Sequence, residues 1–323
     1  MLAANGTSGY LVKLKGAFIS GIKKGWGSFL WICKVIIPVS FLVMLLQWSG
    51  WLYHAEVVLK PLMGWLGLPS EAALPIISGM TINVYAAIAT MTVLPFSIGQ
   101  MTLIAVFVLI AHNLIMEGLI QHRSGINAAR VTLVRLAAAI VTVLIVSQFL
   151  GDTSEIISGV AGLTTGAPIL ETMGQWALDT LILLAKIFGI IMAIMIALES
   201  LMWLGWTDRL FNVSRPLMKI IGLSDRAAML WVTAVVFGLM YGGAVIQERA
   251  RQGDLTKAEL EHLHISIGIN HSMVEDPVLF MALGINGLWL WVPKLVMAAV
   301  AVHVFRLAEY LGRSLRRRGR MPG

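Results

Sequence analysis

The sequence predicts an all-α integral membrane protein made of two homologous helical repeats, which we expect to be inverted and to contain broken or re-entrant helices. Of the 323 residues, 58% are hydrophobic and 13% are charged. The mean hydropathy is +0.83, so water cannot be the main solvent of the chain. Runs of about 20 apolar residues recur, and each is long enough to cross a hydrocarbon core of roughly 30 Å.

The repeat is visible as residues that match between the two halves. Up to Ala73, residues of the first half match residues that lie 155 positions later in the chain. From Gly79 onward the matching residues lie 159 positions later, which corresponds to an insertion of four residues. Matches among His, Gly, Pro and acidic residues rarely arise by chance between two apolar stretches, so they indicate a duplication. The main pairs are Trp51–Trp206, Pro61–Pro216, Gly79–Gly238, His112–His271, Glu117–Asp276 and Arg135–Lys294.

Each half is therefore expected to hold the same series of elements, with one membrane repeat at 28–150 and the other at 174–310. Third elements begin at Ser97 and Thr256, which are helix-starting residues. The expected pairs, in chain order, are first spans at 28–49 and 174–204, amphipathic segments at 53–66 and 208–221, second spans at 70–93 and 225–247, third elements at 97–121 and 256–283, and last spans at 128–150 and 287–310.

The segments outside the repeats are an N-terminal surface helix at 1–27, a linker at 151–173 and a basic tail at 311–323. In residues 1–27, apolar residues recur at helical spacing opposite lysines, a pattern typical of a helix on an anionic leaflet. The net charge is +7, and the excess lies at the two ends. Basic flanks usually mark the cytoplasmic side. We therefore expect a bacterial-type inner membrane with both termini cytoplasmic, and membrane lipid as a partner.

The third elements decide whether the repeat is parallel or inverted. If they cross fully, each half has four spans and the repeat is parallel; if they re-enter, each half has three and the repeat is inverted. The re-entrant version places Arg123 and Arg130 inside with the basic tail, which the positive-inside rule favours. Arg249, Arg251 and Lys257 would then lie outside, so the choice stays open.

The densest polar stretch runs from Gln247 to Pro277, and it is the first candidate for a binding site. On a continuous helix, His264, His271 and Glu275 would share one face. Pro277 is expected to interrupt that helix at Asp276 and to free backbone carbonyls. Broken helices with ionisable groups at membrane depth are a common way to build an ion or substrate site. The candidate residues of this half are Gln247, His264, Asn270, His271, Glu275 and Asp276.

The first half offers a matching set of candidates in His112, Asn113 and Glu117, together with Asn83. Several of these residues also have a purely structural explanation. Glu117 could simply end a helix at the interface, and Asn83 lies among small residues that are typical of close helix packing. Glu259, Glu261 and His262 are expected to be solvated at a helix start.

At these residues the chain resembles the nucleoside recognition, or Gate, superfamily of membrane proteins. The most specific piece is Asn270-His-Ser-Met-Val-Glu-Asp-Pro277, preceded by Gly238-Leu-Met-Tyr-Gly-Gly243. The resemblance covers both halves and extends to spore maturation proteins A and B and to the membrane part of ferrous-iron permeases. It implies a membrane transport role. No GTP-binding domain can be read, so GTP-coupled iron uptake is not implied.

The first functional hypothesis is a secondary transporter or exporter of a small polar solute, with the site between the two repeats and a proton as candidate coupling ion. A divalent metal cation permease is the alternative, which metal-dependent stabilisation would favour. A non-transporting membrane assembly or signalling module is a third, which a wholly occluded polar cluster would favour. No phosphate-binding loop, zinc motif or catalytic triad can be read, so we expect no enzyme activity, cofactor or nucleic-acid partner. A homo-oligomer is compatible with the sequence.

Overall fold

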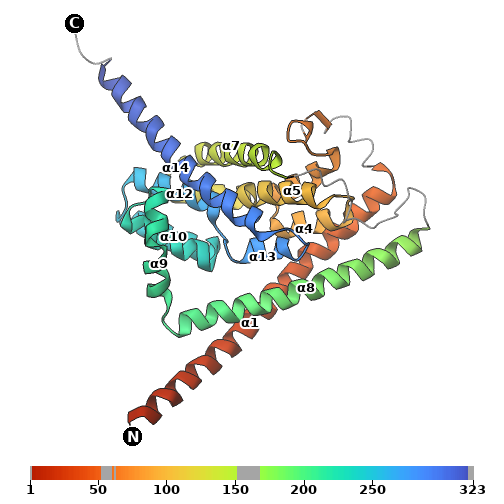
Figure 1. Ribbon diagram of the computed structural model, residues 1–323, viewed down its shortest axis with the longest axis horizontal. Coiled ribbons are helices and arrows are strands. Elements are labelled where there is room, and N and C mark those ends of the chain that lie inside the picture. The colour runs from red at the N-terminus through yellow and green to blue at the C-terminus, as the bar shows by residue number, and fades with distance from the viewer. Residues whose placement is uncertain (1, 52–59, 62, 151–167, 319–323) are drawn as a thin grey trace.

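Two long helices dominate one side of the molecule. The computed structural model describes residues 2–51, 60–61, 63–150 and 168–318, and none of these residues lies in a β-strand. Helices α1 (Leu2–Trp48) and α8 (Ile169–Trp203) pack against each other and cross beside the remaining helices (Figure 1). The other elements are η1 (Ser70–Ala72), α3 (Ala73–Thr81), α4 (Val84–Val93), α5 (Ile98–Ala111), α6 (Leu114–Arg123), α7 (Ala128–Ser147), α9 (Thr207–Ile221), α10 (Asp225–Phe237), α11 (Leu239–Arg251), α12 (Lys257–Asn270), α13 (Glu275–Met281) and α14 (Gly287–Arg318).

Helices α5 and α12 form the centre of the fold. Nearly every side chain of both is buried, because α7 and α14 each pack against both of them. Both central helices begin with a capping box, at Ser97 with Gln100 and at Thr256 with Glu259, which satisfies backbone donors that the first turn leaves free.

The second spans of both halves, expected at 70–93 and 225–247, are each broken into two helices. The first half breaks between α3 and α4, where Asn83 begins α4 by accepting a hydrogen bond from the amide of Ala86 at 3.0 Å. The second half breaks between α10 and α11 at Gly238, whose φ of 83° is accessible mainly to glycine.

The third elements are also broken, but not at the expected place. Helix α12 ends at Asn270 and α13 begins at Glu275, so the break precedes Pro277 instead of lying at Asp276. Pro277 lies in the first turn of α13, where its missing amide hydrogen breaks no helical bond. His271 and Glu275 consequently belong to opposite sides of the break, and the single continuous face with His264 does not form.

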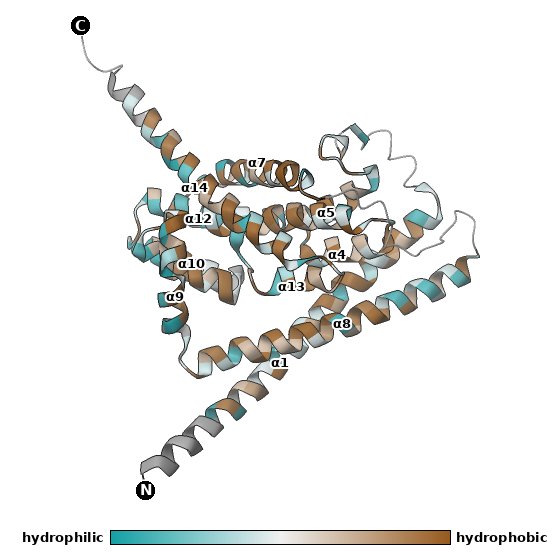
Figure 2. Ribbon diagram, viewed as in Figure 1, coloured by the Kyte–Doolittle hydropathy of each residue, from teal (hydrophilic) through white to brown (hydrophobic). Residues whose placement is uncertain are grey.

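Five helical stretches of the described chain are long and apolar enough to cross a membrane: 13–48, 98–123, 128–147, 169–203 and 287–312. The apolar residues along α1, α5, α7 and α8 are visible in Figure 2. The stretch 98–123 contains the break between α5 and α6, whereas the matching α12 and α13 are not among the five. Whether the third elements cross or re-enter remains a prediction.

The contact between α1 and α8 depends on small residues. A Cβ atom added to Gly21 would lie 2.6 Å from Cα of Ile196, and one added to Gly25 would lie 2.6 Å from the sulfur of Met192. Backbones approach this closely where glycine faces the partner helix. Helix α1 runs without a break through residue 27, so residues 13–27 share one helix with the predicted first span.

The remaining boundaries agree in part with the expected series. Helix α9 matches the amphipathic segment at 208–221. Most of the corresponding segment at 53–66, and residues 151–167 of the expected linker, lie outside the described residues. Helix α8 starts at Ile169, inside the expected linker, and α14 extends to Arg318 in the expected basic tail.

Candidate functional site

Two histidines meet where the two central helices end. His112 is the C-cap of α5 and His271 is the C-cap of α12. The Nδ1 atom of His112 lies 2.9 Å from the carbonyl oxygen of Val108, and that of His271 lies 3.0 Å from the carbonyl oxygen of Ile267. The two Nε2 atoms lie 2.8 Å apart. The imidazoles are thus held by their own helices and face each other across the interface of the halves.

These contacts determine where the hydrogens lie. A carbonyl oxygen can only accept, so each Nδ1 must carry a hydrogen. In a neutral imidazole Nε2 is then a bare acceptor, and two bare acceptors at 2.8 Å would repel each other. The contact becomes favourable when a proton lies between the two Nε2 atoms, which makes one ring an imidazolium, or when another cation bridges them.

Two carboxylates complete a ring of acceptors around this contact. Oε1 of Glu117 lies 3.4 Å from Nε2 of His271, and Oδ2 of Asp276 lies 3.4 Å from Nε2 of His112. Each histidine is therefore paired with the acid of the other half. All four residues are at most 5% exposed. We call these residues, His112, Glu117, His271 and Asp276, the acceptor cluster.

Two buried cations hold the broken helix ends around the acceptor cluster. Arg135 of α7 donates to the carbonyl of Ile110 at 2.9 Å and to that of His112 at 3.1 Å, and it pairs with Glu117 at 2.7 Å. Lys294 of α14 donates to the carbonyl of His271 at 3.3 Å. A helix C-terminus leaves carbonyls unpaired and carries partial negative charge, which both cations neutralise. The register of the halves pairs Arg135 with Lys294, but sequence reasoning assigned neither to the site.

Charge balance points to one additional positive charge. If Glu117, Glu275 and Asp276 are all ionised, these three carboxylates exceed the two cations Arg135 and Lys294 by one negative charge. Buried charge is costly unless it is compensated. One bound monovalent cation, such as the proton that the histidine contact requires, brings the site to neutrality.

Part of the acceptor cluster also suits a metal ion. One ligand atom from each of His112, Glu117 and His271 lies within 4.8 Å of the other two. Imidazole nitrogen and carboxylate oxygen are ligands that zinc, iron and manganese accept. A metal with bonds of about 2.1 Å would require the two Nε2 atoms to move somewhat farther apart than 2.8 Å.

Glu275 links the acceptor cluster to an adjacent cavity. Its Oε1 atom accepts a hydrogen bond from the hydroxyl of Tyr85 on α4. Together with Ser272, Glu275 lines a cavity of about 290 Å³ that extends toward α8 and α1. The buried cluster therefore has a space beside it that small molecules could occupy.

The other predicted site residues have structural positions or lie away from the acceptor cluster. Asn113 has a φ of 55°, and its backbone N–H donates to the carbonyl of Gly79 at 2.9 Å. Asn83 is a helix cap. Asn270 and His264 are buried, and both have side-chain atoms without a hydrogen-bond partner among the described residues. Gln247 is half-buried on α11 and makes none of the cluster's contacts.

The polar start of α12 is less solvated than expected. Glu259 is half-buried and belongs to the capping box, as a helix start predicts. Glu261 is only 6% exposed, and its carboxylate lies 3.8 Å from Arg130 of α7. His262 is mostly buried beside Glu309. These two residues connect α12 to its neighbouring helices.

Local structure agrees between the halves at the offset of 159. Asn113 and Ser272 both have a positive φ, of 55° and 53°. The capping boxes, the histidine-to-carbonyl bonds and the cations on the histidine carbonyls correspond in the same way. These contacts are the ones that a two-fold relation between the halves would produce. The superposition of complete halves remains a prediction.

The first half carries a family signature. Residues 29–151 match the nucleoside recognition (Gate) family. This Gate segment, residues 29–151, contains His112, Glu117 and Arg135, whereas His271, Asp276 and Lys294 come from the part of the chain that follows it. The resemblance inferred from the sequence is thereby confirmed for the first half, and the chain is an all-helical membrane protein.

One curated relative matches the chain over most of its length. It is the "Uncharacterized membrane protein YvoD" of Bacillus subtilis (strain 168), which is 29% identical over 296 residues, covering 90% of this chain and 93% of the relative. A match of this coverage necessarily includes parts of both halves. No solved structure matches the chain.

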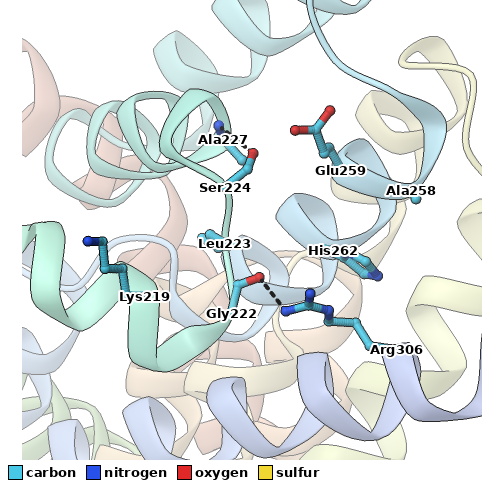
Figure 3. Close-up of a pocket in the computed structure, with 9 residues that line it drawn as sticks. All are labelled: Lys219, Gly222, Leu223, Ser224, Ala227, Ala258, Glu259, His262 and Arg306. Atoms are coloured by element: carbon cyan, nitrogen blue, oxygen red, sulfur yellow. Dashed lines mark hydrogen bonds between the residues drawn. The ribbon is translucent and has the colours of Figure 1, made fainter.

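A second cavity, of about 360 Å³, lies at the end of α9 (Figure 3). Lys219, Glu259 and Arg306 line it from three helices, and Arg306 donates to the carbonyl of Gly222. All of its lining residues belong to the second half, and none is a predicted site residue. It does not combine groups from both halves, unlike the acceptor cluster.

Proposed function

We propose that this protein is a secondary transporter that couples the movement of a small polar solute to a proton bound between His112 and His271. The observation that carries the proposal is the contact of 2.8 Å between two Nε2 atoms whose Nδ1 partners are carbonyl oxygens. A proton site of this kind, buried at the ends of broken helices, can be occupied from either side only when those ends move.

The position of the breaks supports movement at the site. Asn113 and Ser272 adopt left-handed backbone conformations directly after the two histidines. Such residues divide each third element into two short helices, α5 from α6 and α12 from α13. Hinges in transporters are commonly a few residues at the ends of helices. Rotation at these residues would separate the two imidazoles and release the proton.

The first experiment observes the proton directly. In protein labelled with ¹⁵N-histidine, we expect an imidazolium signal that is lost in His112→Ala and equally in His271→Ala. Loss in only one variant would mean that the two rings do not share the proton. The substitution of exposed His122 by Ala is the control, and it should leave the signal unchanged.

The second experiment measures coupling. In proteoliposomes with an imposed pH gradient, a panel of nucleosides, amino acids and amines is tested for uptake. One proton per solute and a gradient of one pH unit allow accumulation of about tenfold. Accumulation should disappear in Glu117→Gln, which removes one negative charge from the acceptor cluster. Uptake that does not depend on the gradient would contradict the proposal.

Divalent metal transport is the second candidate, and the close grouping of His112, Glu117 and His271 favours it. A metal such as Mn²⁺ or Zn²⁺ as cargo would give the balanced site an excess positive charge, which is why we rank it second. Metal transport predicts stabilisation of the wild type by the metal and its loss in His271→Ala.

The burial of the acceptor cluster is also what a non-transporting assembly module would show. The cavity beside Glu275 supports transport over an assembly module, because transport requires space next to the site and an assembly module does not. The cytoplasmic position of both termini in a bacterial inner membrane belongs to the transport proposal and is tested with it.

A further inference from the structure

A cavity of about 290 Å³ lies between α1, α8 and α10, beside the acceptor cluster. Met195, Leu198 and Met202 of α8 form one apolar wall, and residues 235 and 236 of α10 form another. Three charged side chains also line it, namely Lys24, Glu199 and Glu275. Its volume is at the lower end of the range for pockets that bind small ligands, roughly 300–1,000 Å³.

Glu199 is the most unusual member of this lining. It lies on a membrane-spanning helix and is only 4% exposed. Its carboxylate accepts a hydrogen bond from Ser20 at 2.6 Å and forms an ion pair with Lys24. A carboxylate buried in this way is costly unless a cation compensates it. The cavity therefore contains a fixed anion that requires a positive partner.

Lys24 provides the positive partner of Glu199, and another cation can displace its ammonium group. Its side chain is 56% exposed, whereas that of Glu199 is 5% exposed, so the ammonium reaches inward from an accessible position. Lysine has a flexible four-carbon stem and is strongly hydrated. When the ammonium withdraws into water, it leaves an anionic site with walls of methionine and leucine. Methionine adapts to ligands of different shape.

We propose that this cavity binds a small organic cation, a primary ammonium on a short apolar chain, with Glu199 as its anchor and Lys24 as a tethered competitor. The ligand ammonium takes the position of the Lys24 ammonium, and its carbon chain contacts Met195, Leu198 and Met202. Glu275 also lines the cavity, and it directly precedes Asp276 of the acceptor cluster in α13. This assignment names the substrate class of the proposed transporter. Binding in the cavity does not depend on transport, whereas passage of the ligand from the cavity past Glu275 rests on the proposed function.

Binding of hexylammonium to the full-length protein in nanodiscs tests the assignment, with protein-free nanodiscs subtracted. Calorimetry should show saturable binding of hexylammonium and none of hexanol or hexanoate, which share the chain but not the charge. Glu199→Gln should abolish binding. Lys24→Met should tighten it at least about tenfold, because a tethered group competes at an effective concentration of millimolar order. The neighbouring exposed lysine is the matched control, and Lys23→Met should bind like the wild type.

Several results would overturn the assignment. Equal binding of hexanol would show an apolar cavity without charge selection, and binding of hexanoate would make Lys24 the anchor. Absence of hexylammonium binding in both the wild type and Lys24→Met would also end it. Failure of the transport proposal is separable, because His271→Ala should lose proton-coupled uptake and still bind hexylammonium. Binding in a wild type that shows no gradient-dependent uptake would leave the cavity assigned and the transport proposal contradicted.

Discussion

At the scale of single residues, Arg135 makes polar contacts that join the end of α5 to Glu117 in the site. It is fully buried, caps two carbonyls at the end of α5 and neutralises Glu117. A Cβ atom on Gly268 would lie 2.7 Å from Cδ of Arg135, so the glycine leaves room for its stem. The cation is therefore accommodated by both halves, although it belongs to α7.

Arg135→Met should lower the free energy of unfolding by about 3 kcal/mol or more, because it leaves a buried carboxylate without a partner. Arg135→Lys should lower it less, since the charge remains and only part of the hydrogen bonding is lost. Thermal unfolding in detergent measures both, with the exposed Arg123→Met as control. A loss in Arg135→Met no larger than in that control would show that Glu117 is compensated by another group.

Glu275 should matter for function more than for stability. Glu275→Gln retains an oxygen that accepts the hydrogen bond of Tyr85, but it removes one negative charge next to the acceptor cluster. We expect proton-coupled uptake to be abolished while the melting temperature stays close to that of the wild type. Tyr85→Phe is the companion variant, since it keeps the charge and removes only the bond. Uptake at the wild-type rate by Glu275→Gln would remove this carboxylate from the mechanism.

Much of the acceptor cluster could be predicted from residues alone, for a physical reason. His112, Glu117, His271 and Asp276 are polar groups in apolar runs that match between the halves, and membranes tolerate such groups mainly where they are used. The location of the break could not be predicted, because a positive φ at Ser272 follows from tertiary contacts and not from local preference. Pro277 led to the wrong prediction of a helix break at Asp276, since proline is also common in the first turn of a helix.

At the scale of secondary-structure elements, the pair formed by α1 and α8 should be sensitive to side-chain size. Gly21→Ala places a Cβ atom 2.6 Å from the backbone of Ile196, which cannot move away easily. A Cβ atom on Gly27 would meet nothing within 4 Å, so Gly27→Ala is the matched control. We expect a clearly lower melting temperature for Gly21→Ala and no decrease for Gly27→Ala. Equal melting temperatures would mean that α1 and α8 are packed less closely.

The broken elements explain why helix prediction was only partly successful here. Residues 70–93 and 225–247 are apolar enough to resemble continuous spans, and only Asn83 and Gly238 indicate a bend. A cap such as Asn83 is also compatible with ordinary small-residue packing. Arg135 and Lys294 were missed as site residues because the ends of α5 and α12, which they cap, become visible only when the chain is folded.

At the scale of the whole molecule, cysteine labelling reports how the two halves are oriented in the membrane. With an odd number of crossings in each half, single cysteines introduced at 160 and 320 should react with a membrane-impermeant reagent from opposite sides. With an even number, both should react from the same side, and the repeat would be parallel. Labelling in intact cells and in inverted vesicles, on a variant whose Cys33 is replaced by Ser, distinguishes the two arrangements.

The crossed pairing of His112 with Asp276 and of His271 with Glu117 has an evolutionary consequence. Each half carries one histidine and one acid, but its histidine uses the acid of the other half. If the two halves arose by duplication, a single-half ancestor would have needed a second copy of itself to form this crossed pairing. If the repeat is inverted, that copy must have entered the membrane in the opposite orientation. Gene fusion would then have fixed a dual-topology pair in one polypeptide, after which Arg135 and Lys294 were free to diverge.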